Sequence, residues 1–420
     1  MSGFITKIEI EKIRHLKDFQ IEVCDDQIKH LIITGKNGSG KTSLLERIKD
    51  YLQVIPHNYL MDLIYTWPKN LKLNHTWYDQ ILNNPTRTIE QNHESDKFKK
   101  TMIVFENNIK KYANGLQLVF NKPEEIADKY IKGEYILAYF SATRNVRMDI
   151  PTNVPKIQLQ EKYDLQQNIG AMFLNYLVYL KTQQSFARNE NDMVEVNKIQ
   201  HWFDNFEEAL RILFEDNSIY IKFDYKNLNF TIYQDDREPY GFDVLSDGYS
   251  AVLDIIINII LRMEKHRKEA YDTDGIVIID ELENHLHIGL QKNMLPFLTR
   301  FFPNIQFIVS THSPFVINSI ENAVIFDLEK KQRIENLSGI GYQGIVEGYF
   351  DLNQYSEKII NKLERYNELT KKEYKSNEEI EEELILRRYL KGVSPELSPE
   401  VVLAYNNIEI KRKQIDKNVN

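Results

Sequence analysis

The sequence predicts an α/β chain in which helices cover a parallel sheet, and three short apolar runs are the basis of this prediction. The runs at 31–33, 276–279 and 305–309 are dominated by aliphatic residues and are followed by polar or glycine-containing segments. Such runs are typical of strands that are buried on both faces, as in a parallel sheet. Helical spacing follows the first run at 43–48, which predicts a strand, a loop and a helix in succession.

The loop after the first run reads GKNGSGKT at residues 35–42 and fits the pattern G-x-x-x-x-G-K-[ST] in full. Its glycines let backbone N–H groups approach phosphate oxygens, and the start of the following helix adds a partial positive charge. Lys41 would reach the β- and γ-phosphates, and Thr42 would ligate Mg²⁺. The sequence therefore predicts an ATP and Mg²⁺ site. Its residues are Gly35, Lys36, Asn37, Gly38, Ser39, Gly40, Lys41, Thr42 and Ser43.

The two later runs end in polar residues that suit the chemistry of such a site. Asp280 follows the second run and suits a Mg²⁺ position, and the next residue, Glu281, is placed to polarise an attacking water. His312 follows the third run and could contact the γ-phosphate, because ligands of open α/β sheets bind at the carboxyl ends of strands. Taken alone, each has an ordinary explanation as a charged turn or a loop histidine. The prediction depends on their occurrence together with the phosphate loop.

The pentapeptide LSDGY at 245–249 precedes a strongly apolar run at 251–261. The run predicts a helix that is buried on most sides, with Ser246 as its N-cap. The helix start would present N–H groups and a hydroxyl to an anion, and Gly248 would keep the backbone bare there. Without its neighbours in the sequence, LSDGY is equally an ordinary helix cap.

The order of these motifs resembles that of the ATP-binding cassette (ABC) ATPases. The closer resemblance is to the branch that contains SMC and RecF-type heads and OLD-family ATPases. Residues 5–23 look like the first β-hairpin of that branch, and 280–298 with 302–314 resemble the OLD type in detail. One departure is Ile288, which stands where the family usually has proline. The resemblance implies an ABC-type P-loop ATPase head with an N-terminal antiparallel β-hairpin layer, a parallel core sheet, a helical insertion and a C-terminal helical tail.

The resemblance also implies that ATP closes a head-to-tail homodimer, or a higher oligomer built from such dimers. Glu281 would be the catalytic base, and Asn284 and His285 would lie in the loop that crosses the dimer interface. The signature residues, which would contact the γ-phosphate held by a second copy, are Leu245, Ser246, Asp247 and Gly248. The glutamine loop of the family has no clear match. The segment 141–144 is a candidate for it, with Arg144 as its polar residue.

Several segments fall outside the resemblance. Residues 51–130 are expected to form an insertion of helices that ends in a strand, and 151–239 a helical arm over 158–215 followed by a β-hairpin at 219–233. Residues 331–420 are expected to form a helical region that docks a partner. The ATPase head is then assembled from 1–50, 131–150 and 240–330.

Composition limits the classes of protein that fit. The chain has 420 residues, 42% hydrophobic residues and one cysteine, Cys24, so an intrachain disulfide is excluded. Charged residues at the start and the lack of a long uncharged apolar stretch predict a cytoplasmic protein without membrane association. The net charge of −9 argues against general coating of nucleic acid, although a local lysine cluster at 97–111 leaves DNA or RNA as a possible ligand.

The tail at 348–369 resembles those of ATPase subunits from Septu and retron-type defence systems, which work with a separate HNH nuclease. This resemblance implies a sensor or regulator in anti-phage defence whose effector nuclease, of HNH or Toprim type, is a separate subunit. No nuclease motif is visible in the chain itself. Two alternatives stay open, namely a RecF-like DNA-repair ATPase that clamps DNA and a self-contained ATPase toxin with a cryptic nuclease.

Overall fold

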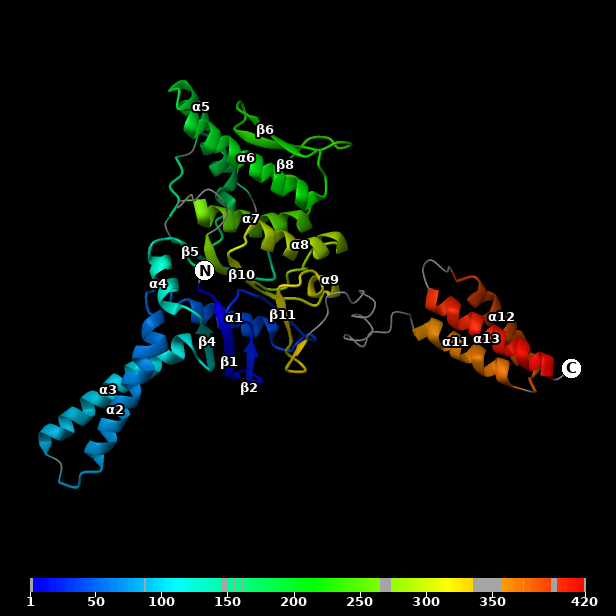
Figure 1. The fold of residues 1–420 in the computed structure, drawn as a ribbon, viewed down its shortest axis with the longest axis horizontal. Coiled ribbons are helices and arrows are strands. Elements are labelled where there is room, and N and C mark those ends of the chain that lie inside the picture. The colour runs from blue at the N-terminus through cyan, green and yellow to red at the C-terminus, as the bar shows by residue number, and fades with distance from the viewer. Residues whose placement is uncertain are drawn as a thin grey trace. The chain divides into compact units, whose positions relative to one another are not determined.

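The computed structural model describes residues 3–334 and 357–418, apart from 87, 145–147, 149, 155, 161, 265–272, 373 and 394–398. The chain divides into two compact units, Met1–Gly339 and Ile340–Asn420, which are described separately below (Figure 1).

A six-stranded sheet forms the centre of the first unit (Figure 1). Its strands lie in the order β12-β11-β3-β10-β9-β5, and all neighbours are parallel except β12, which is antiparallel to β11. The predicted apolar runs form the three adjacent strands β3, β10 and β9, so the predicted parallel core sheet is confirmed. The strand bounds are β3 His30–Thr34, β5 Tyr135–Phe140, β9 Asp274–Ile279, β10 Ile305–Ser310, β11 Ala323–Asp327 and β12 Gln332–Ile334.

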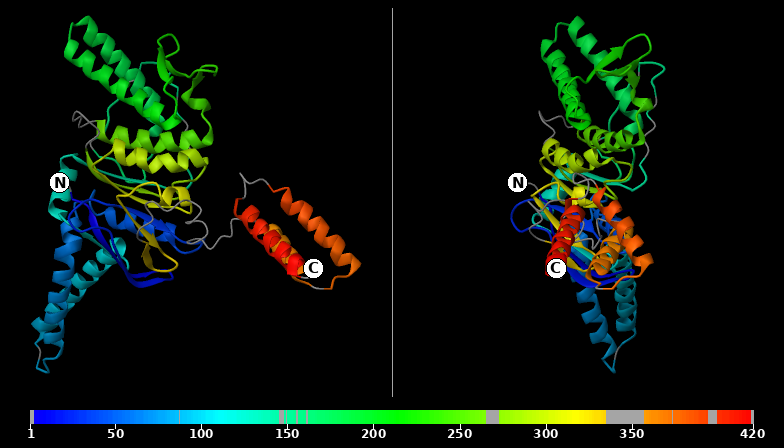
Figure 2. Two further views of the ribbon diagram at one scale, coloured as in Figure 1. Left: turned by 45° about the vertical axis from the view of Figure 1, so that its right-hand side comes forward. Right: turned by 90° about the vertical axis from the view of Figure 1, so that its right-hand side faces the viewer.

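An antiparallel sheet of three strands packs near one face of the central sheet. It consists of β1 Ile5–Ile13, β2 Leu16–Glu22 and β4 Leu116–Phe120 in the order β2-β1-β4, which confirms the predicted hairpin layer. Helix α1, Lys41–Leu52, lies between the two sheets (Figure 2). Its apolar side chains Leu44, Leu45 and Ile48 share one core with side chains of β1, β3 and β9.

The opposite side of the central sheet is covered by α7, Asp247–Met263, and α8, Ile288–Phe301, followed by the short α9, Pro314–Ile317 (Figure 1). Every residue of α7 from 251 to 263 is buried, which explains why most of the run is apolar. Two polar residues lie within this run. Asn258 Nδ2 donates to Asp254 Oδ1 at 2.6 Å, and Asn258 Oδ1 accepts from the N–H of Ile169 at 2.8 Å.

The segment 51–130 forms a helical hairpin that ends in β4, together with one helix that leads to β5. The elements are the π-helical turn η1 Asp62–Thr66, α2 Trp67–Leu82, α3 Ile89–Tyr112 and α4 Pro123–Ile131. Thr88 begins α3 with a capping box that it shares with Gln91. Because β4 pairs with β1, the segment contributes a strand to the antiparallel layer as well as the hairpin.

The segment 151–239 forms a helix pair and a β-meander. Its elements are η2 Gly170–Met172, α5 Phe173–Asn189, α6 Met193–Phe214, β6 Tyr220–Asp224 and β7 Asn229–Tyr233, followed by β8 Tyr240–Gly241 and η3 Phe242–Val244. The predicted β-hairpin is present as β6–β7. The prediction of a helix was wrong for 158–160 and 162–168, which are not helical. There, the carbonyls of Asp164 and Gln167 accept from the Arg262 guanidinium, and that of Leu165 accepts from the N–H of Tyr139.

In its described residues, the second unit consists of three helices, α11 Glu357–Lys371, α12 Asn377–Lys391 and α13 Pro399–Asn418. Helix α12 begins with a capping box between Ser376 and Glu379. The side chains of the small core are Tyr366, Leu369, Leu386, Leu390, Val401, Tyr405 and Ile408. Among the described residues of both units, no helix has the length and apolar character needed to cross a membrane.

The buried carboxyl group of Asp254 makes the stability of the first unit depend on pH. Burial raises its pKa to about 6, against the opposing effects of Arg144, Asn168 and Asn258. Since the pKa in the unfolded chain is about 3.9, this group favours folding fully at low pH, and its contribution is lost as pH rises through about 6.

We therefore expect Asp254→Asn to gain stability relative to the wild type as pH rises from about 4.5 to 8, by about 2 kcal/mol. Urea unfolding of both proteins across this range measures the difference. Asp79→Asn, on the exposed face of α2, is the control and should show no such trend. A difference that stays constant between the two ends of the range would contradict the assigned pKa.

Candidate functional site

The phosphate loop connects β3 to α1 and depends on three glycines. Gly35, Gly38 and Gly40 have φ values of 134°, 81° and 100°, which side chains other than glycine rarely adopt. A Cβ on Gly40 would lie 3.1 Å from the Leu16 side chain, whereas one on Gly38 would meet nothing within 4 Å. The loop therefore rests on the β1–β2 hairpin at one end and is open at its tip.

Lys41 lies at the centre of the loop. Its Nζ donates to the carbonyl of Gly35 at 2.9 Å and to that of Lys36 at 3.2 Å, and the residue is only 6% exposed. Burial lowers the pKa of Lys41, while the carboxylates of Glu281, Glu283, Asp280 and Asp327 act in the opposite direction. The structure thus places this cation opposite the acidic ends of the neighbouring strands.

Ser310, the last residue of β10, joins the two acidic residues that follow β9. Its Oγ donates to Asp280 Oδ1 at 2.5 Å and accepts from the N–H of Glu281 at 2.8 Å. Asp280 is 1% exposed, so one of its oxygens is fixed in direction by this hydroxyl. No motif singles out Ser310 in the sequence. The sequence places Ser310 directly after the apolar run 305–309, and this position could have indicated that it lies near Asp280.

Glu281 has a left-handed backbone with φ of 48°, a conformation that is unfavourable for a residue with a Cβ. Three hydrogen bonds hold it there. Its N–H is bound by Ser310, and its carbonyl accepts from Arg144 Nη2 at 2.6 Å and from the N–H of Asn284 at 3.0 Å. The main chain is thereby fixed while the carboxylate stays partly exposed, as a base that meets water requires.

His312 and Glu283 meet beside these residues. The backbone N–H of His312 donates to Glu283 Oε1. Burial and the charge of Lys41 lower the pKa of His312, so its imidazole is neutral near pH 7. The other carboxylate oxygen of Glu283 is buried and has no hydrogen-bond partner among the described residues. Glu283 was not predicted from the sequence, where it reads only as a third acid in the segment DELE.

Residues 141–144, the candidate glutamine loop, follow β5 and contact the residues that follow β9. Arg144 is 8% exposed and contacts Glu281, and the carbonyl of Ala142 accepts from Asn284 Nδ2 at 2.8 Å. Burial lowers the pKa of Arg144, opposed by the charges of Asp254 on α7 and of the three acids at the end of β9. The predicted interface loop and the predicted glutamine-loop segment are therefore tied to each other.

The signature residues 245–248 lie at the start of α7. Ser246 occupies the N-cap position, as predicted, but its side chain forms no capping hydrogen bond and is exposed. Gly248 packs against the interface loop, because a Cβ there would lie 2.7 Å from the carbonyl oxygen of His285. His285 is itself exposed with φ of 64°. The signature and the interface loop thus form one continuous surface.

The residues fit a bound nucleotide phosphate. Thr34 Oγ1 and Ser39 Oγ, at the start and middle of the loop, are buried and find no hydrogen-bond partner in the described parts of the chain. Thr42 is exposed in the first turn of α1 and can offer its hydroxyl to Mg²⁺, with Asp280 as the nearby carboxylate position. The described residues contain no group of three His, Cys, Asp or Glu side chains suited to a metal ion. Mg²⁺ held mainly by phosphates and waters needs none.

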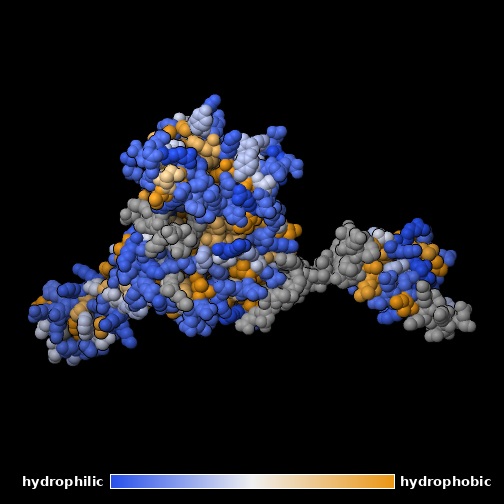
Figure 3. Space-filling view, turned by 45° about the horizontal axis from the view of Figure 1, so that its top comes forward, coloured by the Kyte–Doolittle hydropathy of each residue, from blue (hydrophilic) through white to orange (hydrophobic). Residues whose placement is uncertain are grey.

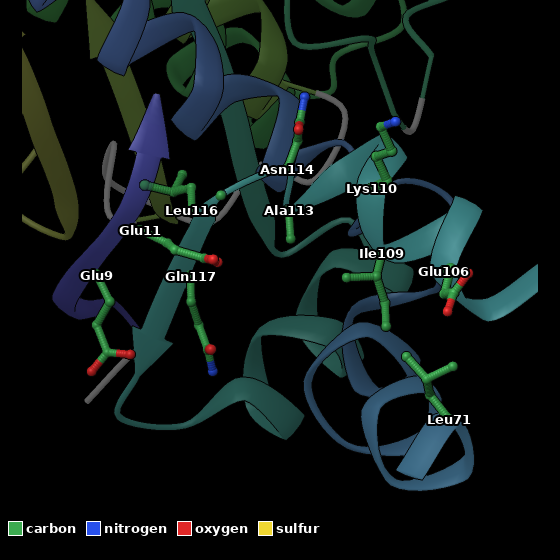
Figure 4. Close-up of a pocket in the computed structure, with 11 residues that line it drawn as sticks. Glu9, Glu11, Leu71, Glu106, Ile109, Lys110, Ala113, Asn114, Leu116 and Gln117 are labelled. Atoms are coloured by element: carbon green, nitrogen blue, oxygen red, sulfur yellow. The ribbon is translucent and has the colours of Figure 1, made fainter. Parts of the chain in front are cut away.

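A separate cavity of about 610 Å³ lies between the edge of the antiparallel sheet and the base of the α2–α3 hairpin (Figure 4). None of the predicted site residues lines it. The side chains at its wall include Glu9, Glu11, Leu71, Glu106, Ile109, Lys110 and Gln117. At the phosphate loop, Gly35 and Lys41 are buried, and the tip at 36–38 is exposed.

Comparison with known proteins identifies relatives. The Septu protein PtuA of Bacillus mycoides (strain KBAB4) is 22% identical over 83% of this chain and 44% of that protein. The Retron Ec83 probable ATPase of Escherichia coli is 33% identical over 32% of this chain and 26% of that protein. The Septu protein PtuA of Bacillus thuringiensis is 29% identical over 36% of this chain and 38% of that protein. The predicted resemblance to Septu and retron ATPases is confirmed, and the chain spans less than half the length of each of these relatives.

Among solved structures, the SmcHead bound to the C-winged helix domain of ScpA has a TM-score of 0.36 and 14% identity, with 77% of this chain and 94% of that chain covered. The SMC head domain from Thermotoga maritima has a TM-score of 0.34 and 12% identity, with 78% and 94% covered.

The family model described as "AAA ATPase domain" matches residues 46–317. This match begins within α1, just after the phosphate loop, and includes the signature residues, the acidic end of β9 and His312. It covers more than half of the chain. The chain therefore belongs to the family of AAA ATPase domains.

Proposed function

We propose that this chain binds Mg²⁺-ATP at residues 35–43 and hydrolyses it within a head-to-tail homodimer. The observation that carries the proposal is the state of Ser246. Its hydroxyl lies at a helix start, where it should cap, yet it makes no cap bond and faces solvent. A hydroxyl and free N–H groups at a helix N-terminus form an anion site, and the phosphate of a second copy supplies the anion.

The side chains divide the work of hydrolysis as follows. Glu281 accepts a proton from the water that attacks the γ-phosphorus, while the bond from that phosphorus to the β–γ bridging oxygen breaks. Lys41 stabilises the negative charge on the phosphate oxygens, and the neutral His312 forms a hydrogen bond with the terminal phosphate. Mg²⁺, held by Thr42 and Asp280, neutralises phosphate charge when it is bound.

Dimer closure follows from the same arrangement. Asn284 and His285 lie beside the signature, so a second copy that approaches residues 245–248 also meets this loop. If only the closed dimer contacts ATP from both sides, ATP shifts the population toward it, and hydrolysis releases it. Gly248 is a poor residue with which to test this model, because any side chain there would disturb the contact with His285 within one copy.

Glu281→Gln should bind ATP but hydrolyse it at least about 100-fold more slowly, because the amide cannot accept the proton. The protein should then accumulate as an ATP-bound dimer. Light scattering after gel filtration, with and without Mg²⁺-ATP, measures this. Glu321→Gln, an exposed acid before β11, is the matched control and should behave as the wild type. Full turnover by Glu281→Gln would refute the assigned base.

A mixing experiment tests whether the signature acts on the other copy. Lys41→Ala removes the phosphate contact of one chain, and Ser246→Glu places a negative charge at the signature of another. Each variant alone should be inactive. In a head-to-tail dimer of the two, one site keeps both Lys41 and Ser246, so an equal mixture should recover about a quarter of wild-type activity. A mixture no more active than its components means that the signature serves its own chain.

We also propose that the ATPase regulates a separate effector nuclease, of HNH or Toprim type, in anti-phage defence. The names of the Septu and retron relatives support this role. The second unit is the proposed docking region, since apolar side chains are exposed on it (Figure 3). On α12 these are Ile380, Leu384, Ile385 and Tyr389, with exposed fractions of 45%, 58%, 61% and 44%.

Leu384→Glu with Ile385→Glu should abolish protection from phage and co-purification with a nuclease encoded in a neighbouring reading frame. ATPase activity should stay within about 2-fold, because both side chains are already in water and the core of the bundle is untouched. Efficiency of plating and affinity purification are the measurements, with Val194→Glu, at an 81% exposed position in the first unit, as the control. Protection by the double variant would exclude this surface. DNA retention or nucleic-acid cleavage by the chain alone would favour the repair ATPase or the toxin instead.

A further inference from the structure

Arg144 is a buried cation whose hydrogen bonds are incomplete. The residue is 8% exposed, and only its Nη2 donates, to the carbonyl of Glu281 at 2.6 Å. Its Nε and Nη1 are buried and have no hydrogen-bond partner among the described residues. A buried donor without a partner costs about 1–3 kcal/mol, and more when it is charged. Such groups are rare in proteins, and a functional site is one setting that retains them.

Another buried arginine in the same unit shows the usual arrangement. Arg262 is 5% exposed, but its Nη1 donates to the carbonyl of Leu137 and its Nη2 to those of Asp164 and Gln167. It joins α7, β5 and the segment before α5, and only its Nε lacks a partner within the described chain. Arg262 therefore has a structural role, because its hydrogen bonds connect separate segments. Arg144 differs because two of its donor groups, Nε–H and Nη1–H, have no hydrogen-bond partner among the described residues.

The charged groups around Arg144 indicate what kind of ligand its unpaired Nε–H and Nη1–H groups could bind. The three carboxylates that follow β9, those of Asp280, Glu281 and Glu283, act on the pKa of both Arg144 and Lys41. The two cations therefore share one acidic cluster, with Lys41 inside the phosphate loop. Glu283 keeps a buried oxygen without a partner in the same cluster, so its geometry does not satisfy the arginine. An anion bound at Lys41 is the group that brings acceptors to this place.

Arg144 also fixes the main chain of the proposed base. Glu281 has an unfavourable left-handed backbone, and Arg144 supplies one of the two hydrogen bonds to its carbonyl. A shift of the guanidinium would therefore turn the peptide that carries Glu281. Movement of Arg144 and orientation of the carboxylate are linked through a single contact.

On the basis of the proposed function, we propose that Arg144 donates from one of its two unpaired groups, Nε–H or Nη1–H, to an oxygen of the terminal phosphate of ATP, and that this contact positions Glu281 for hydrolysis. A guanidinium suits the task because its donors lie in a fixed plane and point in different directions, so one can meet phosphate while Nη2 holds the carbonyl. ADP lacks the terminal phosphate and cannot make the contact.

Arg144→Ala should lower kcat about 100-fold, as the loss of an aligned donor does in other enzymes. It should weaken ATP binding about 10-fold and leave ADP binding within about 2-fold. Guanidinium ions at concentrations that do not unfold the protein should restore part of kcat. Fluorescent ATP and ADP titrations and steady-state hydrolysis provide these values. A wild-type ATP-to-ADP affinity ratio, or a wild-type kcat, would overturn the proposal.

Arg262→Ala is the matched control for the loss of a buried arginine. It should lower the melting temperature without changing the ATP-to-ADP affinity ratio, and guanidinium should not raise its kcat. If the ATP-to-ADP affinity ratio changes equally in Arg144→Ala and Arg262→Ala, Arg144 has only a structural role. Wild-type hydrolysis, measured in parallel, separates two failures. If the wild type does not hydrolyse ATP, the proposed function fails, whereas hydrolysis by Arg144→Ala at the wild-type rate defeats only this inference.

Discussion

The site depends on the parallel register of three strands, because this register brings distant parts of the chain to one edge. Ile33 of β3 lies beside Ser310 of β10, and Val309 lies beside Ile279 of β9. The phosphate loop, the residues after β9 and those after β10 therefore leave the sheet at the same level. The hydroxyl of Ser310 then converts this alignment into fixed positions for Asp280 and for the main chain of Glu281. A slip of one residue between β9 and β10 would turn Ser310 away and separate these groups.

The electrostatics of the site follow from this alignment. Several carboxylates follow β9, and their charges act on two buried cations, Lys41 and Arg144. Burial disfavours the charged forms of both cations, so their neighbourhood with the acids offsets part of that cost. Because opposite charges attract one another in this cluster, an added anion would compete with the carboxylates for Lys41 and Arg144. Nucleotide phosphate changes the charge balance of the whole edge as well as the loop to which it binds.

Local patterns predicted the elements of the fold but few of the contacts between them. The aliphatic runs identified β3, β9 and β10, and Ser246 located the start of α7, because both signals are contained in a few consecutive residues. The non-helical course of 158–168 could not be predicted, since its carbonyls are bound by Arg262 from another part of the chain. Glu283 and the fit of Gly248 against His285 likewise depend on tertiary neighbours. The motif residues were found because their spacing is local, and the residues that orient them were not.

The pairing of β4 with β1 connects the α2–α3 hairpin to the antiparallel sheet. Chain leaving α1 runs into α2, and chain leaving α3 runs into β4, so both legs of the hairpin end in elements that flank the phosphate loop. The β1–β2 hairpin in turn touches that loop, where Leu16 lies beside Gly40 and His15 Nε2 lies 3.1 Å from the carbonyl of Ser39. The α2–α3 hairpin is thus joined through β4 to the same antiparallel sheet that carries the contact with Gly40. A displacement of its far end would act first on that sheet and on the end of α1.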